Sequence, residues 1–323
     1  MGLAIALISG LFVAIALASF ASFWVLLHPP RRTTAWAVSR SLPSDPRELP
    51  RPRAFERWTF RSRGFELPVW DVVGDDPNGP VIVLTHGWGD SRFTMLARID
   101  AFATLASRVI AWDMPGHGEA PGSCTLGWRE AEDLIALLRH LDADDVVLFG
   151  YSLGAGVSIV AGAQRDGKFR PLRGVVAEAP YRVAITPARN VHRLANYPQA
   201  LNLPIAMALA GLRVGAGLGL LERASRGHDG QRRFDRAMWA SRLNVPLLVV
   251  HGERDAVCPV EDGRQIAGAA ARGELALVAG AGHLDMWTQD DTRARAMEAV
   301  ARFLALTRPG REHSAPPASA VAD

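Results

Sequence analysis

The feature that most constrains this chain is the segment Gly-Tyr-Ser-Leu-Gly at 150–154, together with what flanks it. The apolar run at 146–149 is typical of a buried strand, and the small apolar residues at 155–161 favour a helix packed on a sheet. We therefore expect Ser152 at a sharp strand-to-helix turn. The two glycines suit such a turn, because side chains beside the serine would collide with the neighbouring strand and helix. An ordinary glycine-rich loop is the alternative, and the rest of the chain has to decide between the two.

Apolar runs and helical patterns alternate along most of the chain. Short apolar runs predict strands at 81–85, 109–112, 146–149, 174–177, 245–250 and 275–278, after a β-hairpin with arms at 58–61 and 67–73. Helical patterns lie between them at 97–107, 126–141, 259–271 and 292–306. The alternation predicts an α/β domain over residues 56–308, with a mostly parallel, doubly wound sheet flanked by helices.

Residues 182–243 interrupt this alternation, because they are far longer than a simple crossover between two strands. They include the run 204–221, which is rich in glycine and alanine and apolar apart from Arg213. We expect extra helices packed on the end of the sheet, or a cap that shapes a lipophilic pocket, and the two interpretations are compatible. A second transmembrane helix is disfavoured, because the run is short and contains an arginine.

The N-terminal residues 2–27 contain no charged residue and are long enough to span a bilayer, which takes about 20 apolar residues. Trp24 suits an interfacial position near the end of such a helix. We expect a single-pass transmembrane anchor over residues 1–28. A cleaved signal peptide is the alternative, with Ser19-Phe20-Ala21 as a cleavage site, although the chain lacks the basic start that such peptides need.

Arginines follow the expected anchor at positions 31, 32 and 40, whereas only the terminal amine precedes it. The positive-inside rule would therefore place the rest of the chain in the cytoplasm. Residues 29–55 are rich in proline, arginine and serine and are expected to be a linker. Residues 309–323 are expected to be a disordered tail.

Composition excludes several classes of function. The net charge is only +3 without a concentrated basic block, so nucleic-acid binding is not expected. The two cysteines, Cys124 and Cys258, form neither a disulfide framework nor a metal pattern and are expected to be free. The sequence contains no C-x-x-C, H-E-x-x-H or P-loop motif, so we expect no bound metal.

A serine hydroxyl is a poor nucleophile at neutral pH, so Ser152 needs a base and a group that orients that base. His283 lies in a glycine-rich loop just after the last predicted strand, from which it can reach across the sheet edge. Asp255 follows the preceding strand and is the expected orienting acid. Glu178 and Asp113 are competing acids near strand ends, but Asp255 fits the loop better.

Three further histidines, His86, His117 and His251, also lie near predicted strand ends. Each stands close to a glycine, so we expect them to shape loops through hydrogen bonds. A lone histidine is more often a packed residue than a base. His283 is preferred as the base because its position, its loop and the order of its partners agree.

Acyl transfer also needs backbone N–H groups that hold the negative charge on the substrate oxygen. Leu153, directly after the serine, is the expected first donor of this oxyanion hole. Trp88, in the loop His-Gly-Trp-Gly-Asp at 86–90, is the expected second. The elbow and loop glycines that let the backbone come close are Gly87, Gly150 and Gly154.

Five motifs carry a resemblance to a known family. They are H-G-W-G-D at 86–90, D-M-P-G-H-G-E at 113–119, G-Y-S-L-G at 150–154, H-G-E-R-D at 251–255 and G-A-G-H at 280–283. In this order they resemble the α/β-hydrolase superfamily, in particular the single-domain serine hydrolases grouped with serine aminopeptidase-like and monoacylglycerol-lipase-like proteins. The order Ser152, Asp255, His283 is that of the superfamily's catalytic triad, and the turn at 113–118 is structural there.

The resemblance implies a serine hydrolase that cleaves esters or related acyl bonds through an acyl-enzyme, with neither metal nor organic cofactor. The expected partner is a small-molecule acyl substrate, and the anchor and apolar insert suggest a lipid. A thioesterase, an amidase or peptidase, and a cofactor-free peroxidase would use the same triad and stay open. A membrane-tethered binding protein without activity is the alternative of a different class. Residues 182–243, which match no pattern, are where we expect specificity to be set.

Overall fold

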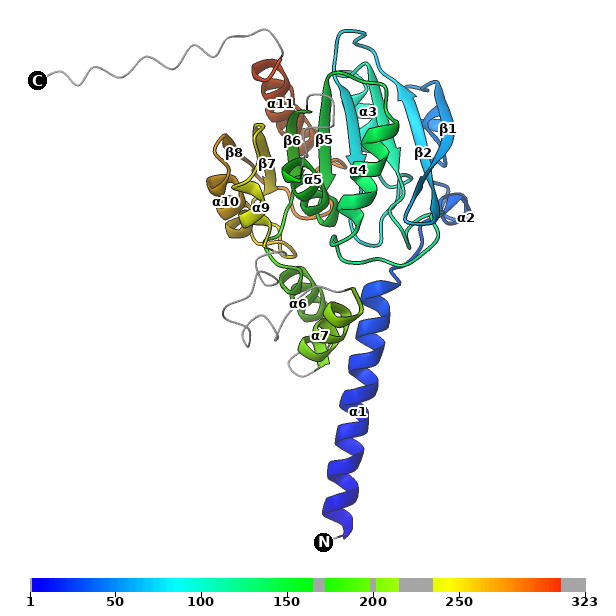
Figure 1. Cartoon of the computed structure of the whole chain (residues 1–323), viewed down its shortest axis with the longest axis vertical. Coiled ribbons are helices and arrows are strands. Elements are labelled where there is room, and N and C mark those ends of the chain that lie inside the picture. Colours follow the sequence, from blue (N-terminus) through cyan, green and yellow to red (C-terminus); the bar gives the residue numbers. More distant parts are fainter. Residues whose placement is uncertain (1, 165–171, 198–201, 215–234, 309–323) are drawn as a thin grey trace, which may run out of the picture.

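The computed structural model describes residues 2–164, 172–197, 202–214 and 235–308, and in them eight strands form one sheet in the order β1-β2-β4-β3-β5-β6-β7-β8 (Figure 1). β1 (Phe55–Ser62) and β2 (Phe65–Val73) form an antiparallel hairpin, and β2 pairs antiparallel with β4 (Arg108–Trp112). From β4 onward, adjacent strands of the sheet pair in parallel. These further strands are β3 (Val81–Thr85), β5 (Val146–Tyr151), β6 (Leu172–Glu178), β7 (Leu247–Gly252) and β8 (Gly273–Val278). The predicted mostly parallel sheet is confirmed.

Helices cover both faces of this sheet. One face packs against α4 (Glu130–His140), α5 (Leu153–Ala163), α9 (Arg236–Ala240) and α10 (Val260–Ala269), and the other against α3 (Leu96–Phe102) and α11 (Asp290–Leu306). Successive strand residues alternate between the two cores, so that Val83 packs on one side and Leu84 on the other. Strands buried on both faces are apolar throughout, which is why short apolar runs located them.

One predicted helix begins later than expected. The pattern predicted a helix over 126–141, but α4 begins at Glu130. Leu126 has a φ of 57° and Gly127 a φ of 91°, and neither value is compatible with a right-handed helix. The buried Glu130 carboxylate accepts hydrogen bonds from the backbone N–H groups of Thr125 and Gly127, and so holds this turn.

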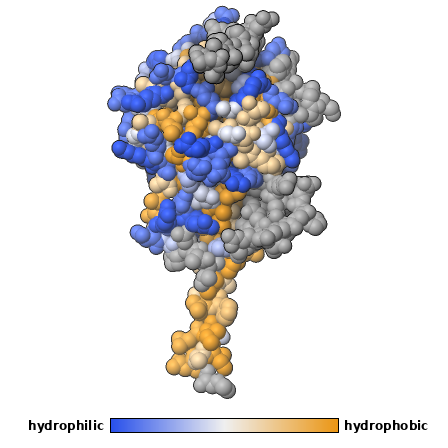
Figure 2. Space-filling view, turned by 90° about the vertical axis from the view of Figure 1, so that its left-hand side faces the viewer, coloured by the Kyte–Doolittle hydropathy of each residue, from blue (hydrophilic) through white to orange (hydrophobic). Residues whose placement is uncertain are grey.

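Helix α1 (Gly2–Leu27) projects from the domain as an apolar shaft (Figure 2). Its 26 residues correspond to about 39 Å, which exceeds the hydrocarbon thickness of a bilayer. By length and composition this helix can cross a membrane, and a signal sequence near the N-terminus would pass the same test. The segment expected to be a linker, 29–55, contains α2 (Thr34–Val38) and the 3-10 helix η1 (Pro46–Glu48) and is hydrogen-bonded to the domain.

The described part of the insert contributes two helices, of which one lies beside α1. α6 (Ile185–Leu194) and α7 (Asn202–Val214) lie below the sheet in Figure 1, and α7 contacts α1. The Asn202 amide donates a hydrogen bond of 2.9 Å to the Ser22 hydroxyl of α1. Residues 198–201 and 215–234 of the insert, and the predicted tail 309–323, lie outside the described residues.

Candidate active site

Ser152 lies at the turn between β5 and α5, at the carboxyl edge of the sheet. Its φ of 53° is in the left-handed region, which is strained for a residue with a side chain. Its backbone N–H donates to the Glu178 carbonyl at 2.8 Å. A Cβ at Gly150 would lie 2.1 Å from the Gly154 carbonyl oxygen, and a Cβ at Gly154 would lie 2.1 Å from that of Thr85. Both glycines are therefore required by close backbone approach.

His283 and Asp255 form a hydrogen-bonded pair at the same edge. The His283 Nδ1 lies 2.7 Å from the Asp255 Oδ2, and the carboxylate is fully buried. The other carboxylate oxygen accepts the backbone N–H groups of Val257 at 2.8 Å and Cys258 at 2.7 Å. Because the Nδ1–H donates to the carboxylate, the Nε2 of the neutral ring is available to accept a proton.

The Asp255 carboxylate is held in its charged form. Burial acts to raise the pKa of Asp255, but hydrogen bonds from His251 and His283 outweigh it and lower the pKa to about 2. The His251 Nε2 lies 3.5 Å from this carboxylate and 2.9 Å from the Cys258 carbonyl oxygen. An anion at this position stabilises an imidazolium on His283, which a general base needs.

Two contacts connect the serine turn to this pair. The Tyr151 hydroxyl donates to the His283 backbone carbonyl at 2.8 Å, and the two rings lie 5.2 Å apart. Burial raises the pKa of the Cys258 thiol well above its usual range, and a hydrogen bond with Ser152 acts to lower this pKa. Within the described residues, no hydrogen bond joins the Ser152 hydroxyl to the His283 ring. Such bonds are often loose without substrate, so the geometry is compatible with a base role.

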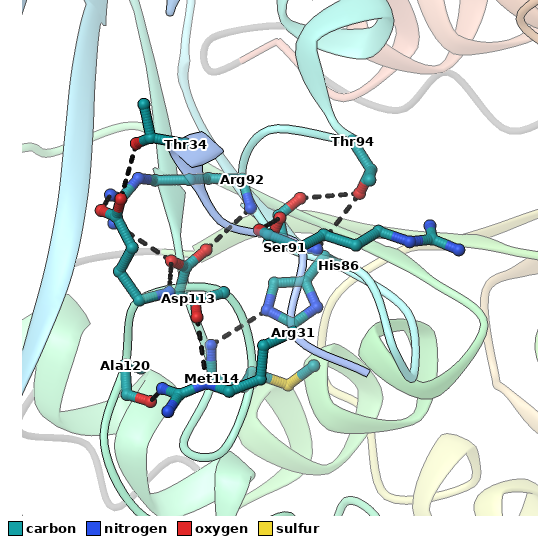
Figure 3. Close-up of polar contacts among 12 residues, drawn as sticks. Arg31, Thr34, His86, Ser91, Arg92, Thr94, Asp113, Met114 and Ala120 are labelled. Atoms are coloured by element: carbon teal, nitrogen blue, oxygen red, sulfur yellow. Dashed lines mark hydrogen bonds and ion pairs between the residues drawn. The ribbon is translucent and has the colours of Figure 1, made fainter. Parts of the chain in front are cut away.

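Two unpaired backbone N–H groups lie where the oxyanion hole was predicted. Neither the N–H of Trp88 nor that of Leu153 donates to any described residue. Leu153 begins α5, and the first N–H groups of a helix have no partner inside it. The His86 ring donates from Nδ1 to the Gly87 carbonyl at 2.8 Å and accepts the Met114 N–H on Nε2 at 3.0 Å (Figure 3). This places one histidine of the loop in a structural role, as expected.

The competing acids are engaged elsewhere. Glu178 pairs with Arg98, whose Nε lies 2.8 Å from the carboxylate, and also accepts the Trp287 indole N–H at 2.9 Å. Asp113 is buried and accepts two backbone N–H groups, from Arg92 at 2.8 Å and from Glu119 at 2.9 Å (Figure 3). Asp113 thus orders the turn at 113–119, and Asp255 is the acid that contacts His283.

The sequence analysis missed three residues of this neighbourhood: Tyr151, Arg98 and Cys258. Tyr151 was inside the serine motif, but its hydrogen bond to the His283 carbonyl joins loops 132 positions apart and leaves no local signal. Both cysteines are free and buried, as predicted, yet the contact of Cys258 with the serine was not anticipated.

Asp255, Cys258 and His283 each offer one ligand atom within 4.8 Å of the others, which is the spacing of a metal site. However, the aspartate and histidine atoms are already hydrogen-bonded to each other. The thiol also stays protonated, because burial raises its pKa. The group therefore fits an acid–base pair better than a set of metal ligands.

Several known proteins are similar to this chain in sequence or in fold. The model of the alpha/beta hydrolase family matches residues 82–303. An uncharacterised protein of Mycobacterium tuberculosis is 28% identical over 277 residues, which cover 72% of this chain and 77% of that protein. A Pyrococcus furiosus esterase superposes with a TM-score of 0.62 at 19% identity, over 87% of this chain and 98% of its own. A bacterial membrane phospholipase A superposes with a TM-score of 0.58 at 17% identity, over 95% and 99%. The two solved structures share the fold of this chain.

Proposed function

This chain belongs to the alpha/beta hydrolase family, and we propose that it is a serine hydrolase that cleaves carboxylic ester bonds through an acyl-enzyme on Ser152. The observation that carries the proposal is the 2.7 Å hydrogen bond between His283 and the buried Asp255, at the sheet edge that holds the strained serine. The two unpaired N–H groups at Trp88 and Leu153 support it. Base, orienting acid and oxyanion donors are the parts that acyl transfer requires.

In this mechanism the Ser152 hydroxyl oxygen attacks the ester carbonyl carbon while the Nε2 of His283 takes its proton. The carbonyl π electrons move to the oxygen, and the N–H groups of Trp88 and Leu153 hold the resulting oxyanion. The C–O bond to the leaving group then breaks, and His283 gives its proton to the departing alkoxide. Water, deprotonated by the same base, releases the carboxylic acid and restores Ser152.

Labelling with a fluorophosphonate probe tests the proposed nucleophile. We expect the native chain to be labelled and Ser152→Ala to be unlabelled and inactive on p-nitrophenyl esters. Ser158→Ala is a matched control, because Ser158 lies buried in the following helix and away from the turn. Absence of labelling in the native chain, or labelling that survives Ser152→Ala, would refute the serine-hydrolase proposal and favour a binding protein without activity.

Thioesterase, amidase or peptidase, and cofactor-free peroxidase activities would use the same triad. They are distinguished by comparing kcat/KM for matched ester, thioester and amide substrates, and by an assay of hydrogen-peroxide-dependent halogenation. We expect the ester to be preferred. A thioester or amide hydrolysed with a higher kcat/KM would move the assignment to that reaction while leaving the triad unchanged.

A lipophilic acyl group is the proposed substrate. Exposed apolar side chains lie on the two insert helices α6 and α7: Val191, Leu194, Ile205, Leu209 and Leu212. Leu284, directly after the proposed base, is 75% exposed. Such surfaces are unfavourable in water unless an apolar partner covers them. A chain-length series of p-nitrophenyl esters should therefore favour medium or long acyl chains, and strong preference for acetate would contradict this.

We also propose that α1 is retained as a single-pass anchor, with the catalytic domain in the cytoplasm. Its length and composition support the anchor, and the flanking arginines support the orientation. The full chain should resist extraction by carbonate, and externally added protease should leave the domain intact in sealed cells. Release of a shortened chain into the soluble fraction would indicate a cleaved signal peptide instead.

A further inference from the structure

The end of α1 and the turn after it are bonded to the loops around the candidate site. We call residues 26–34 the juxtamembrane segment. Figure 3 shows Arg31 and Thr34 of this segment among the residues of the loops that follow β3 and β4. The Arg31 guanidinium donates to the carbonyls of Gly118, at 3.1 Å, and Ala120, and the Thr34 hydroxyl donates to Glu119 at 2.6 Å. The segment is therefore fixed to the 113–120 turn.

The same segment contacts the oxyanion loop, residues 86–90, at the proposed donor and directly after it. The Trp88 indole N–H donates to the Leu26 carbonyl, the next-to-last of α1, at 3.0 Å. Arg32 forms an ion pair with Asp90, and the Arg32 carbonyl accepts the Ser91 hydroxyl at 2.7 Å. Both the side chain of Trp88 and the residues that follow it are thus held from outside the loop.

Within the loop itself, one backbone hydrogen bond spans the Trp88 peptide, from the Asp90 N–H to the Gly87 carbonyl at 3.2 Å. Trp88 stands between Gly87 and Gly89, and Gly89 has a φ of 70°, so the backbone around the donor is intrinsically permissive. His86 holds one side of the loop through the Gly87 carbonyl. On the other side, Asp90 and Ser91 are held by the juxtamembrane segment and by Thr94.

We propose that the juxtamembrane segment is a positioning element of the oxyanion hole. Leu26 and Arg32 hold Trp88 and Asp90 so that the Trp88 N–H points at the oxygen of the substrate carbonyl. The inference rests on the proposed serine-hydrolase function. It makes the end of the membrane helix part of transition-state stabilisation, in addition to any role as an anchor.

The ion pair is placed to contribute to this positioning. The Asp90 side chain is only 10% exposed, whereas the Arg32 side chain is 37% exposed and lies at the domain surface. Burial raises the pKa of Asp90, and the Arg32 charge opposes this effect. Loss of Arg32 would leave a buried carboxylate without its nearest cation, and the loop would then shift or the carboxylate would take up a proton. An oxyanion donor displaced by about 1 Å stabilises the transition state poorly, while substrate binding is little affected.

The test uses the full chain in detergent micelles of one composition, with Arg32→Ala, Arg32→Lys and Trp88→Phe. Arg40→Ala is the matched control, because Arg40 is an exposed arginine of the same region whose guanidinium lies over Trp36 at 5.2 Å. We expect Arg32→Ala and Trp88→Phe to lower kcat about 10-fold with little change in KM. Affinity for a trifluoromethyl ketone, which forms an oxyanion on the serine, should fall by a similar factor. Arg32→Lys should restore most of the activity, and Arg40→Ala should leave it unchanged.

Two outcomes would overturn the proposal. One is an unchanged kcat in both Arg32→Ala and Trp88→Phe, and the other is an effect on KM alone, which would indicate a role in substrate binding. If Arg32→Ala fails to fold, Trp88→Phe decides the question, because it keeps an aromatic side chain and removes only the hydrogen bond to Leu26. If the fluorophosphonate labels Ser152 but these variants retain full kcat, only the positioning proposal is refuted. A chain in which Ser152 is not labelled loses the proposed function itself.

Discussion

The two sides of Ser152, that of the proposed base and that of the proposed oxyanion hole, are supported by different parts of the molecule. On the base side, His283 is bonded to Asp255 and to the Tyr151 hydroxyl, and all three residues belong to loops and strands of the sheet. On the oxyanion side, Trp88 and the following residues are bonded to Leu26 and Arg32, which precede the sheet in sequence. The base side is thus built within the hydrolase fold, whereas the oxyanion side also depends on the N-terminal segment.

This difference indicates which part of the site the sheet positions without help from the N-terminal segment. Parallel strands bring the loops after β7 and β8 together, because Gly252 and Val278 are paired at the ends of these strands. The oxyanion loop follows β3 at the same edge, but its glycines restrict the backbone less than other residues would. Contacts from outside the sheet therefore add to the hydrogen bonds within the loop in holding its conformation. We expect variants on the base side to affect activity and stability differently from variants on the oxyanion side.

The largest effect is expected on the base side, from Asp255→Asn. An asparagine amide cannot stabilise an imidazolium and favours the wrong ring tautomer of His283, so kcat should fall roughly 10³- to 10⁴-fold. Kinetics on a p-nitrophenyl ester measure this. Glu253→Gln is the matched control, because Glu253 is exposed two positions earlier and should be neutral. Near-normal activity of Asp255→Asn would mean that another acid orients the base.

A large effect on stability is expected from the buried pair that underlies the base side. Arg98 and Glu178 are both buried, and the Arg98 guanidinium also lies 4.4 Å from the Tyr151 ring centroid. Arg98→Met leaves the Glu178 carboxylate buried without its cation, which should lower the free energy of unfolding by about 3–5 kcal/mol.

Thermal unfolding of the full chain measures this change. Arg302→Ala breaks an exposed ion pair with Glu274 and should cost less than about 1 kcal/mol, which makes it the matched control. The double variant Arg98→Met with Glu178→Gln should recover part of the loss, since it removes the unpaired charge. If Arg98→Met were as stable as the native chain, the base side would not depend on this pair.

Local signals in the sequence were sufficient to predict the serine turn and the pairing of Asp255 with His283. The serine turn was predictable because Gly150 and Gly154 stand two positions on either side of Ser152, where close backbone approach requires glycine. The pairing of Asp255 with His283 was expected because each residue directly follows a strand, and neighbouring parallel strands end at the same edge. Features that depend on register and local sequence are therefore visible without a structure.

Contacts between segments distant in sequence were not predictable. Residues 29–55 were expected to be a linker from their proline and arginine content, yet Arg31, Arg32 and Thr34 are bonded to loops more than 50 positions away. Composition describes how a segment behaves when it is isolated, and it cannot indicate which surface will bind it. The onset of α4 was missed for a different reason, because hydrogen bonds from Thr125 and Gly127 to the buried Glu130 override the helical pattern.

As the pH falls, the oxyanion side should lose stability at a higher pH than the base side. Burial lowers the pKa of His117 from 6.5 to about 4 and that of His86 well below its usual value, and the two rings lie 4.9 Å apart below the oxyanion loop. As the pH falls below about 6.5, these histidines bind protons in the unfolded chain but not in the fold, so stability is lost. For His117, the contribution to the free energy of unfolding that is lost by pH 4 is about 3 kcal/mol. The lowered pKa of Asp255, about 2, confines its own loss to pH values below about 4.

Thermal unfolding between pH 7 and pH 4.5 tests this order. His117→Gln should be less stable than the native chain at pH 7, but its stability should depend less on pH, because one of the buried titrating groups is gone. Loss of activity in the native chain should accompany the loss of stability, since His86 and His117 bind protons once the chain unfolds. An identical pH dependence in the two chains would mean that His117 is accessible to protons in the fold.

The smallest expected effect concerns a single hydrogen bond on the base side. Tyr151→Phe keeps the ring against Arg98 and His283 and removes only the hydroxyl that holds the His283 carbonyl. One neutral hydrogen bond contributes about 1 kcal/mol, so kcat should fall about 5-fold with little change in thermal stability. Tyr197→Phe is the matched control, because Tyr197 is exposed on the insert. The rate of fluorophosphonate labelling should fall with kcat, because it also depends on deprotonation of Ser152 by His283. Unchanged labelling and kcat would mean that the Asp255 bond alone holds the base, and that the base side needs less support than the oxyanion side.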